Sequence, residues 1–507
     1  MLRFYNTLTR KKDVFKPIKG RTVGLYTCGP TVYSYAHLGN LRTYIFEDVL
    51  KRVLIANGYR VTHLMNITDV GHLTSDADTG EDKIEKEAKK EKKTAWQIAD
   101  FYTKAFFGDT QKLNIIKPDI IAKATDYIAE DIQLIQELEK QGFTYRTSDG
   151  IYFDTSKLKD YGKLTGMTFE KLNKTLKAGS RIEISPEKRN ITDFSLWKFS
   201  PSAGGKRQME WSSPWGIGFP GWHIECAVIN LKFLGHAFTN HRFVPQKAQT
   251  IDIHCGGIDH IPVHHTNEIA QVEAVTKKPF VNFWLHGEFL VLPKARMGKS
   301  ESNTILIKDL EKMGFSPLAF RYLVLNSHYR TPLEFSFEAL ENSQNSLNNL
   351  SDFVYDLLWC AKKQKTNPKN LINIKKYYQD FEAALNDDLN TPQALAFLWK
   401  LSTEYYQLKK NSQSWNKINF KQIYKIVLEF DKILGLSLNN IKFVSSPRSI
   451  IALTKQREKA RQQKNFQQAD ELRRQIEKLG FRIEDTMWGP KIMKIYNNIL
   501  YKYNITI

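Results

Sequence analysis

Residues 21–67, RTVGLYTCGPTVYSYAHLGNLRTYIFEDVLKRVLIANGYRVTHLMNI, contain the pattern that decides the fold of this chain. The run from Arg21 to Cys28 is short and apolar, which is typical of a buried strand. Apolar residues then recur at helical spacing from Leu41 to Ala56, and Arg60 to Ile67 predicts a second strand. A strand, a helix and a strand in this order build doubly wound parallel sheets, so ligands are expected at the carboxyl ends of the strands.

The same pattern returns in the middle of the chain after a long interruption. Lys83 to Gln141 is charged and predicts helices, whereas Gly142 to Ser213 has the turns and short strand-like pieces of an insertion. Thr250 to His254 and Val281 to Leu292 then predict strands on either side of a helix from about Ile261 to Thr276. We therefore expect one α/β sheet whose two halves are separated by an inserted domain.

The last third of the chain predicts helices almost throughout, beginning at Phe335. Asn390-Thr391-Pro392 is a typical helix start, with a capping residue shortly before a proline. Ser445-Ser446-Pro447 indicates a linker, and two basic helices follow it, from Ile450 to Lys464 and from Phe466 to Leu479. We expect a helical bundle followed by a small C-terminal domain.

The composition indicates a globular protein of several domains. With 507 residues, of which 42% are apolar, the chain is too long for one ordinary hydrophobic core. No stretch resembles a signal peptide or approaches the roughly 18 consecutive apolar residues of a membrane span, so we expect a cytoplasmic protein without membrane association. The four cysteines are too scattered for a disulfide framework and are expected as thiols: Cys28, Cys226, Cys255 and Cys360.

The charge balance favours a polyanionic partner. Lysine and arginine total 74 against 54 aspartate and glutamate residues, which gives a formal net charge of +20. A basic surface gains affinity for nucleic acid when it displaces counterions from the phosphate backbone. Charge alone also fits a general effect on solubility, so this interpretation needs a motif to support it.

Two short segments have the features of nucleotide-binding sites. His37-Leu38-Gly39-Asn40 lies at the start of the first predicted helix, where backbone N–H groups and the helix dipole favour a phosphate. Arg296-Met297-Gly298-Lys299-Ser300 follows the strand-like Phe289 to Leu292 and lies in a polar loop that contains glycine. Together and in this order, the two segments resemble the HIGH and KMSKS signatures of the class I aminoacyl-tRNA synthetases.

Four residues of metal-binding type are candidates for one zinc site. Cys28 ends the first predicted strand, Cys226 lies farther along the chain, and His264 and Glu268 are four residues apart, on one face of a helix. Two sulfurs, an imidazole and a carboxylate form a suitable set of zinc ligands. Spacing leaves other interpretations open, because the cysteines also fit a core and the histidines a surface. Alternative ligands lie nearby, namely Cys255 and His260.

Nearly the whole chain is similar to the cysteinyl-tRNA synthetases. The similarity rests on these blocks: Tyr26 to Tyr33, Asn66 to Asp69, Pro220 to Cys226, Asp252 to Glu268, Phe320 to Tyr322, His328 to Arg330, Asp387 to Pro392, Ala469-Asp470 and Glu484 to Thr486. Several of the blocks are specific to this one synthetase family. The resemblance implies a Rossmann-type doubly wound catalytic sheet with an inserted connective domain, an α-helical bundle and a small anticodon-binding domain.

The resemblance also implies roles for particular residues. It implies that zinc is bound by Cys28, Cys226, His264 and Glu268. It implies that the cysteine pocket is lined by Gly29, Thr31, Thr68, Trp222 and His254. It implies that Mg-ATP is bound by His37, Gly39, Asn40, Met297, Lys299 and Ser300, of which His37, Asn40 and Lys299 act in catalysis by stabilising phosphate charge.

The implied reaction has two steps and three substrates. The carboxylate of L-cysteine attacks the α-phosphate of Mg-ATP, and a terminal ribose hydroxyl of tRNA(Cys) then attacks the cysteinyl-adenylate. Zinc would select cysteine over serine, because it accepts a thiolate and binds a hydroxyl poorly at neutral pH. The alternatives are a ligase that joins cysteine to an amino sugar and a non-catalytic RNA-binding paralogue.

Some positions depart from the family pattern. Asn40 replaces the second histidine of HIGH, and Cys255 replaces a glycine and could compete for the metal. Two stretches of unassigned role are longer than usual, Val70 to Asp82 and Lys232 to Gln249. We expect a monomer with these divisions: two halves of the catalytic domain (1–120 and 214–292), a connective insertion (121–213), the RMGKS loop and stem-contact region (293–340), the helical bundle (341–444) and the C-terminal domain (445–507).

Overall fold

A computed structural model gives the structure of the protein. It describes residues 1–71, 82–179, 187–200, 207–292, 295–296, 304–410, 412–442, 447–486 and 488–494. The chain divides into two compact units. Unit 1 consists of Met1–Leu306, His328–Glu334 and Asn386–Leu389, and unit 2 consists of Ile307–Ser327, Phe335–Leu385 and Asn390–Ile507.

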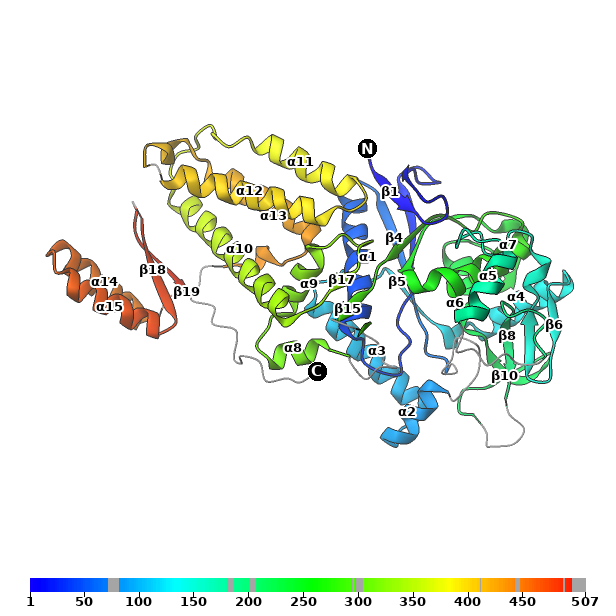
Figure 1. Ribbon diagram of the computed structural model, residues 1–507. Coiled ribbons are helices and arrows are strands. Elements are labelled where there is room, and N and C mark those ends of the chain that lie inside the picture. The colour runs from blue at the N-terminus through cyan, green and yellow to red at the C-terminus, as the bar shows by residue number, and fades with distance from the viewer. Residues whose placement is uncertain are drawn as a thin grey trace. The chain divides into compact units, whose positions relative to one another are not determined.

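The centre of unit 1 is a five-stranded parallel sheet in the order β14-β13-β3-β4-β5 (Figure 1). Its strands are β3 (Thr22–Thr27), β4 (Arg60–Ile67), β5 (Ile120–Lys123), β13 (Ile251–Gly257) and β14 (Val281–Gly287). The chain moves from β3 to β4 in one direction and from β13 to β14 in the other, so the order reverses between β3 and β13. This arrangement confirms the doubly wound sheet, and ligands bind at such a reversal point, beyond the carboxyl ends of the strands.

The connections between the strands are also as the sequence predicts, with one exception. Helix α1 (Leu38–Ala56) joins β3 to β4, and α7 (Thr266–Thr276) joins β13 to β14. The charged segment after β4 forms α2 (Lys83–Glu91), α3 (Ala95–Lys112) and α4 (Ile128–Lys140). The exception is β5, which lies between α3 and α4. Its four residues are too few to show a pattern within a charged helical region.

The insertion forms a second, antiparallel sheet in the order β6-β7-β8-β10-β9. Its strands are β6 (Thr144–Arg146), β7 (Gly150–Phe153), β8 (Phe194–Phe199), β9 (Trp211–Ser213) and β10 (Gly216–Pro220), and it includes α5 (Phe169–Gly179). The last strand leads directly into α6 (Trp222–Phe233). The insertion therefore ends directly before α6, the helix that carries Cys226.

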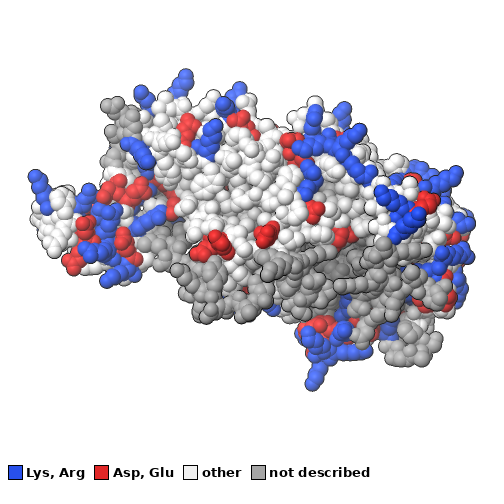
Figure 2. Space-filling model, in the orientation of Figure 1, with Lys and Arg blue, Asp and Glu red and all other residues white. Residues whose placement is uncertain are grey.

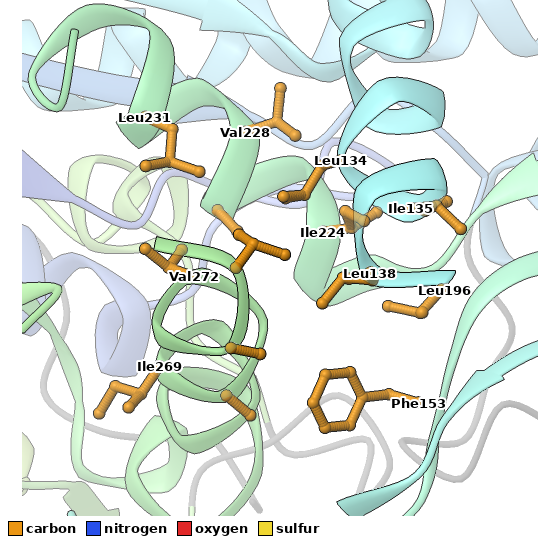
Figure 3. Close-up of a cluster of buried hydrophobic side chains, with 14 of the residues drawn as sticks. Leu134, Ile135, Leu138, Phe153, Leu196, Ile224, Val228, Leu231, Ile269 and Val272 are labelled. Atoms are coloured by element: carbon orange, nitrogen blue, oxygen red, sulfur yellow. The ribbon is translucent and has the colours of Figure 1, made fainter. Parts of the chain in front are cut away.

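One hydrophobic cluster joins the insertion to the helices of the central sheet (Figure 3). In the close-up, side chains of α4, α6 and α7 point toward one another and toward the strands β7 and β8. The labelled members are Leu134, Ile135, Leu138, Phe153, Leu196, Ile224, Val228, Leu231, Ile269 and Val272. Because α6 carries Cys226 and α7 carries Glu268, this core fixes the relative positions of two candidate metal ligands.

Small strand pairs complete unit 1. They are β1 (Arg3–Asn6) with β2 (Lys11–Val14), β11 (Phe238–Thr239) with β12 (Arg242–Phe243), and β15 (Leu290–Leu292) with β16 (Ala295–Arg296) and β17 (Leu333–Glu334). The pair β11–β12 lies in the long stretch 232–249. The segment 386–389 returns to unit 1, where Asp388 is fully buried and accepts hydrogen bonds from Tyr5 N–H and the Tyr329 hydroxyl. Asp388 therefore fixes this returning segment.

Unit 2 is mainly helical, as predicted. Its helices are α8 (Ile307–Lys312), α9 (Pro317–Leu325), α10 (Phe337–Lys363), α11 (Ile374–Asn386), α12 (Thr391–Lys410), α13 (Phe420–Leu434), α14 (Arg448–Gln462) and α15 (Phe466–Lys478). The chain then forms a hairpin of β18 (Phe481–Thr486) and β19 (Gly489–Lys494), which the sequence pattern did not predict. Trp488 is half-buried against the rings of Trp359 and Trp415.

Candidate active site and metal centre

A cavity of about 860 Å³ opens at the carboxyl ends of β3 and β13. Its wall includes Cys28 and Gly29 after β3, His37 at the start of α1, and Trp222 and Cys226 of α6. All these residues belong to unit 1. The cavity therefore occupies the reversal point of the sheet, where the sequence predicts ligand binding.

The four candidate zinc ligands lie together beside this cavity. One ligand atom each from Cys28, Cys226, His264 and Glu268 can be chosen so that all four lie within 4.8 Å of one another, and all four residues are buried. His264 belongs to a π-helical turn, Ile261–His265, that leads directly into α7. The π turn brings His264 and Glu268 onto the same side, and such turns occur often at functional sites.

The charges of this cluster favour a cation. Burial raises the pKa of the Cys28 thiol well above its ordinary value, and Cys226 adds to this effect. The hydrogen bond from Cys28 lowers the pKa of Cys226 to about 6, against the effect of burial. Burial disfavours a charged His264, but the negative charges of Cys226 and Glu268 outweigh the effect of burial and raise the pKa of His264 to about 10. Burial disfavours an ionised Glu268 as well, but His254 and His264 outweigh it and lower its pKa to about 2.

A second group of possible ligands overlaps the first. It consists of Cys28, His254, His265 and Glu268. Because the two groups share Cys28 and Glu268, they describe alternative positions for one ion. The first group fits zinc better by its chemistry, since it offers two sulfurs, an imidazole and a carboxylate. Cys255 is fully buried in β13 and belongs to neither group found among the described residues.

Three further histidines contact the candidate ligands of the first group. His254 Nε2 lies 2.8 Å from Glu268 Oε2, and His223 Nδ1 lies 2.8 Å from His264 Nδ1. His265 Nε2 lies 3.3 Å from Cys28 Sγ. Partners of this kind hold metal ligands in a fixed orientation. His223 and His265 are not among the predicted site residues, although they directly follow Trp222 and His264 in the sequence.

A tight contact between the segment after β3 and the end of β4 positions Cys28. The Gly29 N–H donates to Asn66 Oδ1 at 2.7 Å, and a Cβ atom at Gly29 would lie 1.6 Å from the Asn66 carbonyl oxygen. Only glycine fits this approach. The Asn66 amide also donates to the Thr68 hydroxyl at 3.0 Å, and Thr31 forms a bridge to Thr68. Asn66 therefore organises the wall that contains three predicted pocket residues.

The predicted cysteine-pocket residues do not all face the cavity. Gly29, Thr31, Thr68 and Trp222 contribute to its wall, together with His260, which the sequence offered only as an alternative metal ligand. The Trp222 ring lies 4.4 Å from the His264 ring, between centroids. His254 is fully buried, is not part of the wall, and contacts Glu268 instead.

The HLGN segment forms the N-terminal cap of α1. The His37 Nδ1 atom accepts a hydrogen bond from Asn40 N–H, and Asn40 Oδ1 accepts one from His37 N–H, both at 3.3 Å. This is a capping box, and the spacing of a polar pair three residues apart at a helix start was the signal for it. His37, Gly39 and Asn40 all line the cavity at the positive end of the helix dipole.

The second nucleotide segment is described only in part. Strand β15 pairs with Ala295–Arg296, and the chain is described again from Thr304. The predicted ATP-binding residues Met297, Lys299 and Ser300 lie outside the described residues. Arg296, the first residue of this segment, therefore lies in a short strand beside β15, which includes part of the strand that the sequence predicts up to Leu292.

No helix in the described part of the chain combines the length and apolar character that a membrane crossing requires.

Comparisons with known proteins agree with this geometry. Residues 14–345 match the family described as tRNA synthetases class I (C) catalytic domain, and residues 380–439 match the DALR domain. The cysteine–tRNA ligase 1 of Burkholderia lata is 45% identical over 494 residues, which cover 97% of this chain and 96% of that protein. The cysteine–tRNA ligase of Treponema denticola is 43% identical over 509 residues, which cover 96% of this chain and 98% of that protein.

Solved structures support the same fold. Mycobacterium tuberculosis methionyl-tRNA synthetase in complex with methionyl-adenylate has a TM-score of 0.58 and 15% identity, and covers 83% of this chain and 93% of its own. This similarity concerns the fold alone. Together with the near full-length matches at more than 40% identity, it leads to one conclusion: the chain belongs to the cysteinyl-tRNA synthetases, a family of class I aminoacyl-tRNA synthetases.

Proposed function

We propose that the cavity of unit 1 is the site at which this enzyme, a cysteine–tRNA ligase, activates L-cysteine with Mg-ATP and transfers it to tRNA(Cys). The observation that carries this assignment is the buried group of Cys28, Cys226, His264 and Glu268 at the wall of a large cavity. A donor set with two thiols is suited to a metal that recognises a third sulfur. It thus matches the substrate named by the relatives.

The proposed resident metal is one zinc ion held by Cys28, Cys226, His264 and Glu268. Their chemistry fits, since all four are zinc ligands and a soft sulfur pair favours zinc over magnesium or calcium. When bound, zinc would supply a Lewis acid that prefers a thiolate to a hydroxyl. The protein contributes rigidity through His254 and His223, which contact Glu268 and His264.

The proposed cysteine pocket is the adjoining wall, with Gly29, Thr31, Thr68 and Trp222 as its residues. Thr68 accepts a hydrogen bond from Asn66, so its hydroxyl proton remains available to donate. The Trp222 indole closes the side next to His264. For His254 we propose an indirect role, since it is a partner of Glu268 rather than part of the wall.

The proposed nucleotide site lies between the start of α1 and the RMGKS loop. His37, Gly39 and Asn40 are at the helix N-terminus, where backbone N–H groups favour phosphates. Met297, Lys299 and Ser300 would approach from the loop, and Lys299 would offset the negative charge that develops on the leaving pyrophosphate. No protein nucleophile is needed, because catalysis rests on positioning and charge stabilisation.

The proposed two-step reaction also decides between the alternatives. The cysteine carboxylate attacks the α-phosphate, pyrophosphate leaves, and a terminal ribose hydroxyl of tRNA then displaces AMP from cysteinyl-adenylate. A ligase for an amino sugar has no evident use for unit 2, and a non-catalytic paralogue has no need to keep Cys28, Cys226, His37 and Lys299.

We further propose how the chain is divided. The catalytic domain is 1–120 and 214–292, interrupted by the connective insertion 121–213 and followed by the loop and stem-contact region 293–340. Strand pairing moves both ends of the insertion, because β5 (Ile120–Lys123) pairs in the central sheet and β10 (Gly216–Pro220) pairs in the sheet of the insertion. The bundle 341–444 and the C-terminal domain 445–507 bind the tRNA. The two basic helices α14 and α15 are the natural phosphate-binding elements there. We propose a monomer that acts in the cytoplasm without membrane contact, because its proposed substrates are found there.

The test is ATP–pyrophosphate exchange on zinc-loaded protein, followed by addition of tRNA. Exchange with cysteine and not with serine, followed by cysteinylation, is the expected result. A matched pair of variants locates the site: Cys226→Ser should abolish zinc-dependent exchange, whereas Cys360→Ser should retain it, because Cys360 is a buried thiol of α10 in unit 2. Exchange without tRNA transfer would favour the small-molecule ligase, and absence of exchange in folded, zinc-loaded protein would favour the RNA-binding paralogue.

A further inference from the structure

The helices α2 and α3 carry cations and aromatic rings to the rim of the cavity. Lys83, Lys86 and Glu87 of α2 and Tyr102 and Phe106 of α3 form part of its wall. None of them belongs to the zinc, cysteine or ATP sites proposed above. This side of the rim therefore has the composition of a binding surface without an assigned ligand.

The lysines of α2 form a stripe that leads away from the cavity. Lys83, Lys86 and Lys90 are three and four residues apart and share one face of the helix. Residues 83–93 contain six lysines against three glutamates. Helix α2 projects from unit 1 in Figure 1, and basic side chains, with acidic ones among them, gather at the same place on the surface in Figure 2.

The ion pairs along this stripe are weak and can be exchanged. Lys90 Nζ lies 3.2 Å from Glu87 Oε1, and the Lys90 side chain is 74% exposed. Exposed pairs of this kind contribute little and are screened by salt. A phosphate that approaches α2 can therefore replace the carboxylate as the partner of Lys90.

Aromatic rings form a second path from the cavity wall to the surface. The Tyr35 ring lies 5.2 Å from the ring of Tyr102, which lines the cavity, and 6.1 Å from the ring of Phe101, between centroids. Phe101 is 40% exposed, and Lys93 Nζ lies 4.7 Å above its ring. An exposed ring beside cations is the usual arrangement in proteins that bind single-stranded nucleic acid, since bases stack on the ring and phosphates bind the cations.

We infer that the α2–α3 surface, formed by Lys83, Lys86, Lys90, Lys93, Tyr35 and Phe101, guides the unpaired 3′ end of the tRNA into the cavity. The inference rests on the proposed function, because the transfer step requires a terminal ribose hydroxyl inside the cavity. The unpaired strand has exposed bases for Phe101 and phosphates for the stripe of lysines. The surface binds the strand without reading its sequence, since stacking and phosphate contacts are not base-specific.

The test compares Phe101→Ala and Lys90→Gln with two controls. Lys140→Gln removes the same charge from an exposed pair with Glu137 on α4, and Ile55→Ala removes an apolar side chain, 47% exposed, from the last turn of α1. Each test variant should raise the KM for tRNA in cysteinylation about fivefold or more, as expected for the loss of one stacked base or one phosphate contact. The controls should stay within about twofold of the parent.

A shortened tRNA gives a second readout. A tRNA without its unpaired 3′ nucleotides should bind the parent and Phe101→Ala with equal affinity, whereas intact tRNA should distinguish them. Equal tRNA KM values for parent and test variants would overturn the inference, as would a rise in the KM for ATP in the exchange assay, which would assign the lysines to the nucleotide. If the parent itself fails to exchange or to charge tRNA, the proposed function fails instead, so the two failures are distinguishable.

Discussion

The backbone N–H of Leu38 donates a hydrogen bond of 2.9 Å to the carbonyl oxygen of Ile305. Leu38 is the first residue of α1, and Ile305 follows the RMGKS loop. The contact joins the two nucleotide segments, which are more than 250 residues apart in the sequence. The end of the loop is thereby attached to the helix whose start lines the cavity.

A buried arginine attaches the beginning of the same loop. Arg42 of α1 is 2% exposed and donates to the carbonyl oxygens of Phe289 and Thr331, and at 3.4 Å to that of His328. Phe289 directly precedes β15, which leads into the loop. Arg42 therefore acts as a positioning residue that holds the base of the loop against α1.

Replacing Arg42 by lysine should impair the first half-reaction. Lysine keeps the charge but cannot donate in a planar fork to separate carbonyl groups. A displacement of about 1 Å in positioned groups can reduce a rate about 100-fold, so we expect kcat for ATP–pyrophosphate exchange to fall about 10- to 100-fold. The control is Arg52→Lys on the same helix, which pairs with Asp48 on α1 at 2.7 Å and should have a much smaller effect on kcat. An unchanged kcat in folded Arg42→Lys would contradict the positioning role.

The elements that the sequence predicts correctly are those whose pattern is local. Strand β4 matches its prediction of Arg60 to Ile67, because an apolar run between turn signals is complete within eight residues. Strand β5 was missed because four residues give no period, and the hairpin β18–β19 because its residues are largely polar. Packing against distant elements decides such strands, and a single stretch of sequence does not contain that information.

The candidate site shows the same limit. The sequence offered Cys28, Cys226, His264 and Glu268 with Cys255 and His260 as alternatives, and spacing could not choose among residues that meet only in the folded chain. The structure brings the four together and leaves Cys255 in the sheet. Conversely, the contact of His254 with Glu268 depends on the packing of β13 against α7, which no local pattern reveals.

The two overlapping ligand groups predict different effects on zinc affinity. If Cys226 and His264 are ligands, Cys226→Ser should weaken zinc binding by more than about 100-fold, whereas His254→Ala and His265→Ala should each weaken it about 10- to 100-fold, as partners of ligands do. Competition with a chelator measures these affinities without reference to activity. A larger loss in His265→Ala than in Cys226→Ser would place the ion in the second group.

Zinc binding should release protons. Burial and Cys226 raise the pKa of Cys28, so this thiol is protonated at pH 8, and His264, with a pKa of about 10, is protonated as well. Cys226, with a pKa of about 6, is already a thiolate. Zinc requires thiolates and a neutral imidazole, so about two protons should leave for each ion bound near pH 8. Affinity should therefore rise with pH, about 100-fold per unit between pH 7 and 9.

Calorimetry in two buffers of different ionisation enthalpy measures the released protons directly. Chelator competition at several pH values gives the slope independently. The variant Cys226→Ser is informative, because it removes the thiolate that raises the pKa of His264 and should lower the number of protons released. An affinity that does not depend on pH between 7 and 9 would contradict the assigned charges.

Gly29→Ala should disrupt the wall of the cavity. The new methyl group would lie 1.6 Å from the Asn66 carbonyl oxygen, a backbone atom that cannot move aside cheaply. We expect a loss of stability of about 3 kcal/mol or more, at the upper end of the range for overpacking. Gly108→Ala is the matched control, since it lies in α3 with nothing within 4 Å and should be neutral or stabilising. Thermal unfolding of both variants measures this difference, and equal midpoints would mean that Gly29 does not lie against the end of β4.

Asp356 of unit 2 is a buried carboxylate that should hold the C-terminal hairpin β18–β19 against the helices of this unit. Its carboxylate is 2.6 Å from Lys409 Nζ and also pairs with Lys491 of β19, and both Asp356 and Lys491 are 1% exposed. Burial opposes its ionisation, but Lys491 and Lys409 outweigh burial and lower its pKa. The stability that it provides is therefore present above its ordinary pKa and is lost only as the pH falls below that value.

Asp356→Asn would remove the buried counterion of Lys409 and Lys491, which would keep the half-exposed Glu484 as a partner. We therefore expect a loss near the lower end of the about 3–5 kcal/mol that breaking a buried pair costs. Because Trp359, Trp415 and Trp488 pack together beside the pair, release of the hairpin should appear in tryptophan fluorescence at lower urea concentration than in the parent. The control is Glu429→Gln, which breaks an exposed pair with Lys432 and should cost less than about 1 kcal/mol. If the two variants unfold together, the ion pair does not hold the hairpin; if only Asp356→Asn loses tRNA charging while retaining exchange, the hairpin acts in the tRNA step alone.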